Sequence, residues 1–441
     1  MDRKLQIPKR YMDLFISLLG YGFVPLLGIV SSILAARVLG PSGRGELAAV
    51  QVVPGFLTVF AFWGCGQSVP YYTARSPERV GLIVGSALLL GLAMCLPAIL
   101  IGAPIQAFVL ADFSDPVRSA GYLFLLFPIC NVLNAMSWGA LQGKKHFLQF
   151  NLVRVQPQII FVLVIISATL LHRPSVFAII VAYLLLTLLI CATTSWLVYW
   201  KYCAEVLSVS RETVRDLFKY GTFSAGAFLC SALNQRVDQA FIAAMLSKED
   251  LGIYVTAAAV SFAIAPMASA FGAVLIPRLA PGIVENSCQQ LGRLLRWYVV
   301  FVFAIVFLIF CLIPILIPLL FGNAFEPAIH IARILIVAGG FLSLSAVLSD
   351  IFRGLGNPAV ALYAELSALG MTVIGLFASL SRLGIVGAAF TSLVSYLVSC
   401  TVLIILLLRL HPKVLNGWLA AYGEDLVVIF RKLRHFRFRH G

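Results

Sequence analysis

Apolar residues recur in long blocks along the 441-residue chain, separated by short stretches of polar and charged residues. A helix of about 20 apolar residues crosses the hydrocarbon core of a bilayer, which is roughly 30 Å thick. The connections between blocks are short, so there is no room for a catalytic domain outside the membrane. The blocks predict twelve membrane-spanning helices, at roughly 12–38, 46–71, 80–110, 119–141, 150–171, 175–200, 217–246, 252–277, 294–321, 328–352, 359–381 and 385–409.

The composition agrees with this pattern. Hydrophobic residues make up 61% of the chain and charged residues 11%, whereas a soluble domain averages about 25% charged residues. The predicted fold class is therefore an all-α polytopic membrane protein. The basic segment MDRKLQIPKR leads into an apolar block that is too long for a signal peptide. The nine cysteines are scattered, with no CxxC pair and no Cys/His cluster, so we expect no disulfide, no metal site and no cofactor.

Lysine and arginine are distributed unevenly between alternate loops. With a cytoplasmic N-terminus, 24 of the 32 basic residues fall in cytoplasmic segments and seven in outer segments, and Arg236 alone lies deep in a span. Cytoplasmic loops of membrane proteins carry such an excess, so both termini are expected in the cytoplasm, at the cytoplasmic (inner) membrane. Anionic headgroups attract such residues by about 1 kcal/mol each. The net charge of +14 therefore indicates membrane lipids as partners and not nucleic acid.

A weak internal repeat divides the chain. At an offset of 207, six residues of the first part match six of the second, among them Gly45 with Gly252; Gly143 and Gly356 correspond at an offset of 213. A duplication of six spans predicts two six-helix lobes, 1–204 and 205–409, related by a pseudo-two-fold axis along the membrane normal.

Two segments look interfacial. Residues 205–219 are predicted to connect the lobes as a short amphipathic helix that starts near Ser210, and 410–441 form a basic amphipathic cytoplasmic tail. The simplest role for the tail is a membrane anchor, with binding of a partner as the alternative.

Three strings carry a resemblance to a known family: LGPSGRGELAAV after the first span, LNQRVDQAFIAAMLSKEDLGIYVTAAAV at the seventh and GLGNP after the tenth. The chain resembles the oligosaccharide flippases of the multidrug/oligosaccharidyl-lipid/polysaccharide (MOP) exporter superfamily. The resemblance implies two lobes around a central cavity, a polyprenyl-diphosphate-linked saccharide as cargo, and alternating access. It also implies polysaccharide polymerase and export machinery as further partners.

The stretch SALNQRVDQA places five polar residues inside the seventh predicted span. An unpaired charge at this depth costs about 2.5–3.5 kcal/mol, so these side chains are expected to face protein or water. One hypothesis makes them cavity-lining, with Arg236 binding the diphosphate bidentately and the amides binding sugar hydroxyls. The alternative is a polar network between packed helices. The residues are Asn234, Gln235, Arg236, Asp238 and Gln239.

Other polar residues are weaker candidates. Arg37, at the end of the first span, suits a cationic cavity mouth, whereas Arg44 and Glu46 fit a solvated turn at least as well. Polar residues of the fourth and fifth spans are expected to line the cavity or to guide a diphosphate inward, although Arg154 also suits anchoring at the membrane surface. These residues are Asn131, Asn134, Arg154 and Gln158.

Asp238 and Glu365 are candidates for ion coupling, because burial favours the protonated form of a carboxyl group. An interfacial ion pair is the alternative for Glu365, and Asp350 with Arg353 is expected to pair at i, i+3 spacing. Pro25 interrupts the first span between Gly22 and Gly28 and is a candidate hinge.

The leading hypothesis is a flippase for polyprenyl-diphosphate-linked oligosaccharide repeat units in surface or exopolysaccharide biosynthesis. The alternative within the superfamily is a cation-coupled multidrug-type exporter. The protein is predicted not to be an enzyme, because a membrane polymerase or ligase needs a substantial outer loop with catalytic groups. A scaffolding protein remains a further alternative.

Overall fold

Helices form throughout the described part of the chain, which contains no strand. The structure is a computed structural model that describes residues 9–63, 65–171, 175–202, 208–264, 267–268, 271, 285–355 and 357–412. The elements are α1 (Lys9–Phe62), α2 (Cys65–Arg75), η1 (Pro77–Arg79), α3 (Val80–Val109), α4 (Asp115–Phe124), α5 (Phe127–Gly143), α6 (Phe147–Leu170), α7 (Val176–Tyr202), α8 (Arg211–Asn234), α9 (Val237–Met245), α10 (Lys248–Ser261), η2 (Phe262–Ile264), α12 (Glu285–Phe321), η3 (Asn323–Phe325), α13 (Ala328–Gly354) and α14 (Pro358–Leu410).

The chain is a multi-pass membrane protein. Among the described residues, eight helical stretches are long and apolar enough to cross a bilayer. They are Phe23–Phe62, Pro77–Val109, Asp115–Gly143, Phe147–Leu170, Val176–Tyr202, Leu291–Phe321, Ala328–Arg353 and Ala359–Leu410.

Two of the helices are far longer than a bilayer requires. α1 has 54 residues and α14 has 53, and at 1.5 Å per residue each is about 80 Å long if straight. Each contains one glycine with non-helical backbone angles, Gly40 (φ 65°) in α1 and Gly384 (φ 56°) in α14. Residues with a Cβ avoid this left-handed region, so glycine is the residue suited to it. Both glycines lie in turns that the sequence pattern predicts, between 38 and 46 and between 381 and 385.

Several predicted spans are interrupted, which the apolar pattern did not indicate. The predicted span 119–141 consists of α4 and α5, and 217–246 consists of α8 and α9. The helix that begins after Gly40 ends at Phe62 and resumes at Cys65, with Trp63 at φ 36°. By contrast, α8 begins at Arg211 with Ser210 at its N-cap, as predicted, although it continues to Asn234 and is not a separate interfacial helix.

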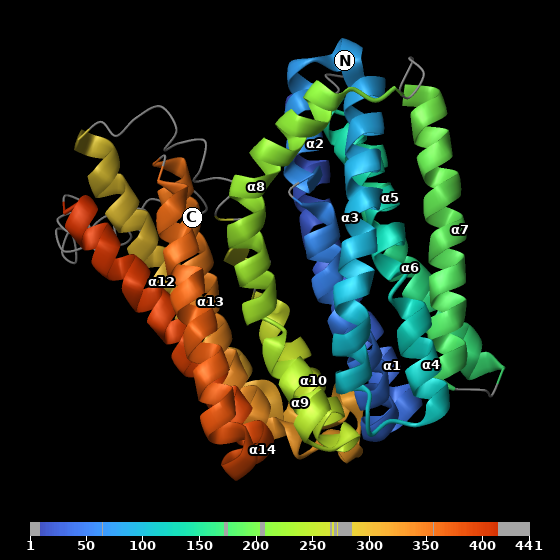
Figure 1. The fold of residues 1–441 in the computed structure, drawn as a ribbon. Helices are drawn as coiled ribbons and strands as arrows, with labels where there is room; N and C mark the ends of the chain where they lie inside the picture. The colour runs from blue at the N-terminus through green and yellow to red at the C-terminus, as the bar shows by residue number, and fades with distance from the viewer. Residues whose placement is uncertain are drawn as a thin grey trace, which may run out of the picture.

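The described helices fall into two groups, the N-terminal half (9–202) and the C-terminal half (208–412). Figure 1 shows α3 to α7 on one side and α12 to α14 on the other; the two groups approach each other at the end near α9 and α10 and spread apart toward the opposite end. We call these the convergent end and the divergent end.

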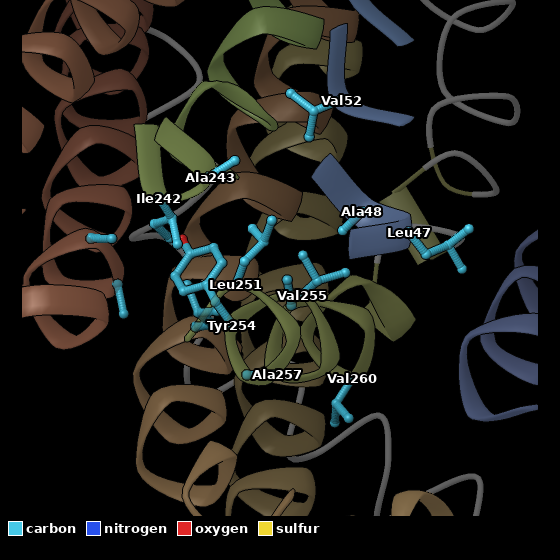
Figure 2. Packing of buried hydrophobic residues seen from close by; sticks show 14 of the residues in the cluster. Leu47, Ala48, Val52, Ile242, Ala243, Leu251, Tyr254, Val255, Ala257 and Val260 are labelled. Atoms are coloured by element: carbon cyan, nitrogen blue, oxygen red, sulfur yellow. The ribbon is translucent and has the colours of Figure 1, made fainter. Parts of the chain in front are cut away.

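At the convergent end the halves meet along α1 and α10. Buried side chains of α1 face those of α9 and α10 there (Figure 2). The buried residues of this region include Leu47, Ala48 and Val52 from α1, and Ile242, Leu251 and Val255 from the other half.

Two glycines allow the backbones to touch at this contact. A Cβ on Gly45 would lie 1.7 Å from the carbonyl oxygen of Lys248, and a Cβ on Gly252 would lie 1.9 Å from the carbonyl oxygen of Pro41. The contact is reciprocal, because Pro41 and Lys248 are separated by the same 207 positions as Gly45 and Gly252. The glycine pair of the predicted repeat therefore lies face to face at the junction of the halves.

Toward the divergent end, α8 packs against the N-terminal half. The indole Nε1 of Trp63 donates to Oγ1 of Thr222 at 3.1 Å, and Tyr71 stacks on Tyr220 with ring centroids 5.0 Å apart. α8 therefore contacts both halves, because its last residue bonds to α14 as described below.

Candidate functional site

The polar stretch 234–239 lies where the seventh predicted span breaks. α8 ends at Asn234, Gln235 is its C-cap, and α9 starts at Val237 with Arg236 as N-cap. The amide of Arg236 donates to the carbonyl of Leu233 at 3.1 Å, and the amide of Gln239 donates to the carbonyl of Arg236 at 3.1 Å. The expectation of one continuous helix is therefore wrong, since polar residues favour local bonds that compete with the helix. Broken helices at membrane depth occur where the backbone is buried in protein or lines a cavity.

Asn234 binds α14. Its Oδ1 accepts a hydrogen bond from Oγ1 of Thr372 at 2.6 Å and from Oγ of Ser395 at 3.2 Å. Thr372 and Ser395 also bond to each other at 2.6 Å, and all three side chains are buried. Asn234 therefore ties the end of α8 to both segments of α14, before and after Gly384.

Asp238 is the centre of a second buried network. Its Oδ2 accepts hydrogen bonds from the hydroxyl of Tyr254 and from Oγ of Ser392, the latter at 3.2 Å. Its Oδ1 accepts from the amide of Gln239 at 2.7 Å. A carboxylate near a helix N-terminus is also favoured by the helix dipole. These contacts correspond to the polar-network hypothesis for Asn234 and Asp238.

Arg236 has a different environment. It is solvent-exposed, unlike Asn234, Asp238 and Gln239 of the same stretch, which are buried. Its guanidinium faces α1, where a Cβ on Gly55 would lie 3.6 Å from its Nη1. Asp238 and Arg44 are both close enough for their charges to interact with that of Arg236.

Arg44 is the functional candidate that the sequence pattern misassigned. It is buried, with 8% of its surface exposed, and does not lie in a solvated turn. Its Nη2 donates to Oγ of Ser32 at 3.3 Å, and its Nε has no hydrogen-bond partner in the described part of the chain. A buried guanidinium without a carboxylate partner is costly. The sequence gives little indication that Arg44 is buried. Arg44 comes shortly after Gly40, and the helix that follows Gly40 already includes it, before the apolar block that begins at residue 46.

Arg37 and Glu46 join the two halves at the convergent end. Nε of Arg37 donates to the carbonyl of Leu320 at 2.6 Å, and its guanidinium also donates to the carbonyl of Leu319. These carbonyls belong to the last turn of α12, where a cation is favoured by the helix dipole. Nζ of Lys248 lies 2.8 Å from Oε1 of Glu46, and this hydrogen bond raises the pKa of Lys248.

The other predicted cavity residues are spread over the N-terminal half. Nδ2 of Asn131 donates to the carbonyl of Phe127 at 3.2 Å, within its own helix, and Nδ2 of buried Asn134 donates to the carbonyl of Val153 at 3.0 Å. Cζ of Arg154 lies 5.9 Å from the ring centre of Phe150. Gln158 is half-buried on α6. Asn134 therefore joins α5 to α6.

The remaining candidates lie on α14, α13 and α1. Glu365 lies near Ser231 of α8 and interacts with the charge of Arg353. Nη1 of Arg353 lies 2.7 Å from Oδ1 of Asp350, which confirms the predicted i, i+3 pair. Pro25 lies within α1, whose non-helical backbone angles occur at Gly40.

Within the described residues, no three His, Cys, Asp or Glu side chains are arranged to hold a metal ion. The predicted tail, 410–441, lies outside them from residue 413 onward.

Comparisons with solved structures show the fold. The chain aligns with a multidrug resistance MATE family transporter of the MOP superfamily in its inward-facing conformation over 90% of this chain and 98% of that one, with a TM-score of 0.70 and 16% identity. It aligns with the lipid II flippase MurJ in an inward closed conformation over 92% and 90%, with a TM-score of 0.73 and 14% identity. A MOP superfamily transporter from Pyrococcus furiosus aligns over 89% and 93%, with a TM-score of 0.57 and 16% identity. No curated protein matches the chain.

The chain therefore has the fold of these MOP superfamily proteins. A family profile described as "Polysaccharide biosynthesis protein" matches residues 12–282. The chain belongs to this polysaccharide biosynthesis protein family, which confirms the superfamily that the sequence motifs indicate.

Proposed function

We propose that the protein is a flippase that moves polyprenyl-diphosphate-linked oligosaccharide repeat units across the cytoplasmic membrane, and that it is not an enzyme. The observation that carries the proposal is the pair Arg44, which is buried, and Arg236, whose charge acts on it from the other half of the protein. Asp238, the acid that interacts with Arg236, is already engaged by Tyr254 and Ser392. With two guanidinium groups and one carboxylate the net local charge is positive, and a diphosphate would compensate it through bidentate hydrogen bonds.

The layout supports transport by alternating access. We infer twelve spans in two six-helix lobes, 1–204 and 205–409, with α1 and α14 each supplying two spans. The reciprocal contact of Gly45 and Gly252 supports a two-fold axis between them, because a two-fold contact pairs residue i with j and j with i. The convergent end would be extracytoplasmic and closed, and both termini would be cytoplasmic. Membrane lipids and polysaccharide polymerase and export machinery are the proposed partners.

A cation-coupled multidrug-type exporter is the second candidate. Asp238 favours it, because a carboxylate bonded to Tyr254 and Ser392 in a buried site can exchange a proton or a cation. Glu365 is the other proposed coupling residue. Arg44 and Arg236 argue against a cationic drug as cargo, since they would repel it.

A binding experiment separates the two candidates. Purified protein is titrated with a polyprenyl diphosphate and with a polyprenyl alcohol of the same chain length. Arg44→Gln and Arg236→Gln should each weaken diphosphate binding by roughly 10- to 100-fold, the effect of losing one charge-assisted hydrogen bond, and leave alcohol binding unchanged. Lys219→Gln, which removes an exposed cation of α8, is the matched control. If both arginine variants bind diphosphate as tightly as the unaltered protein, the proposal is wrong.

A further inference from the structure

α7 carries a continuous apolar stripe that faces away from the protein. Leu185, Leu189, Trp196 and Trp200 follow one another at helical spacing, and each is more than half exposed. The two indoles stack on each other, with ring centroids 6.2 Å apart at the end of the stripe. From Leu185 to Trp200 the stripe is about 22 Å long, close to the length of an extended acyl chain.

Three lysines surround the end of α7 next to these indoles. The ammonium of Lys144, in the turn between α5 and α6, donates to the carbonyl of Tyr202. Nζ of Lys201 lies 5.7 Å from the ring centre of the same tyrosine. Lys145 is exposed beside Lys144. None of the three takes part in an ion pair among the described residues.

Lys145 occupies a backbone position that suits glycine. α5 ends in a Schellman motif, in which the amide of His146 donates to the carbonyl of Leu141 at 2.9 Å and that of Lys145 to the carbonyl of Gln142 at 3.0 Å. The left-handed residue of such a motif is usually glycine, but here it is Lys145, at φ 63°. A residue with a Cβ is strained in this conformation. The turn thus presents an ammonium group at the cost of a less favourable helix end.

We propose that the end of α7, with Lys144, Lys145 and Lys201, binds the phosphate headgroup of an anionic phospholipid, whose acyl chain lies along the stripe of Leu185, Leu189, Trp196 and Trp200. Tryptophan suits this boundary, because its ring is apolar and its N–H group is polar. The charge of the three lysines selects an anionic headgroup over a zwitterionic one. The site is on the outer edge of the N-terminal half, as α7 in Figure 1 shows, and is separate from Arg44 and Arg236.

Native mass spectrometry of the purified protein tests the site, with dioleoyl phosphatidylglycerol and dioleoyl phosphatidylcholine as probes. The unaltered protein should bind the anionic lipid more tightly. Each lysine contributes about fivefold to this preference, so Lys145→Gly with Lys201→Gln should lower it by roughly 10- to 30-fold. Lys145→Gly relieves the strained turn, so this variant should unfold at a temperature no lower than the unaltered protein. Loss of binding would then not be a consequence of misfolding.

The control removes two cations elsewhere. Arg215→Gln with Lys219→Gln takes two exposed charges from α8 and should keep the preference for the anionic lipid. An equal loss in this control would mean that the basic surface as a whole attracts the lipid, and would overturn the proposal. So would an unaltered protein that binds both lipids equally.

Discussion

Gly45 of α1 and Gly252 of α10 face each other across the junction of the two halves, and each lies against a backbone carbonyl of the opposite half. Neither site has room for a methyl group. We therefore expect Gly45→Ala or Gly252→Ala to force the halves apart at the convergent end and to favour the opposite conformation.

Spin labels on α7 and α13 near the divergent end would report this change as a shorter distance between them. Gly370→Ala is the matched control, because a Cβ at Gly370 of α14 meets no atom within 4 Å. An alanine at Gly45 that leaves the distance distribution unchanged would show that the glycine contact does not hold the halves together.

The pair Lys248 and Glu46 should contribute to the same closure. Lys248→Glu should favour separation of the halves at the convergent end, and the double exchange Lys248→Glu with Glu46→Lys should restore closure. The effect should be small, at most about 1 kcal/mol, because the pair is partly exposed. The degree of closure is measured by labelling cysteines that are introduced at the convergent end. A double exchange no better than the single variant would contradict the contact.

This closure should also depend on pH. Because the hydrogen bond to Glu46 raises the pKa of Lys248, the ammonium contributes stability below its unfolded pKa, and that contribution is lost as the pH rises through the raised value. The contact should therefore persist at neutral pH and weaken only in strongly alkaline solution, as followed by the same labelling. Lys248→Gln should remove the alkaline transition.

Asp238 should be required for stability. Asp238→Ala leaves the buried hydroxyl of Tyr254 with Ser392 as its remaining partner, and we expect a loss of about 1–3 kcal/mol, measured as a lower unfolding temperature in detergent. Tyr254→Phe in the same protein should recover part of the loss, because the hydroxyl that lacked its acceptor is gone. If Asp238→Ala abolishes transport without lowering stability, the carboxylate serves ion coupling and not packing.

The topology can be tested by cysteine labelling. In a variant without its native cysteines, a cysteine at position 145 should react from the cytoplasmic side and one at 382 from the outside. Impermeant reagents applied to intact cells and to inverted vesicles distinguish the two sides. The reverse pattern would contradict the orientation inferred from the lysine and arginine distribution.

The sequence alone was sufficient for the class of protein, because crossing a bilayer requires long apolar helices whatever their packing. It also located the turns at Gly40 and Gly384, where polar residues interrupt the apolar blocks, and it paired Gly45 with Gly252 through the repeat. The motifs at 39–50 and 233–260 indicated the superfamily. Each of these is a local or periodic property of the chain.

Only the tertiary structure decided which polar residues share a site. Asn234 and Asp238 bind Thr372, Ser395, Tyr254 and Ser392, most of them more than a hundred positions away along the chain. Arg44 and Arg236 belong to different halves, and no periodicity in either segment predicts that they approach each other. The break between α8 and α9 was likewise hidden, because a polar stretch inside an apolar block is compatible with a continuous helix as well as with a broken one. Helix packing brings these residues together, and packing depends on the shape of the whole protein and not on any single span.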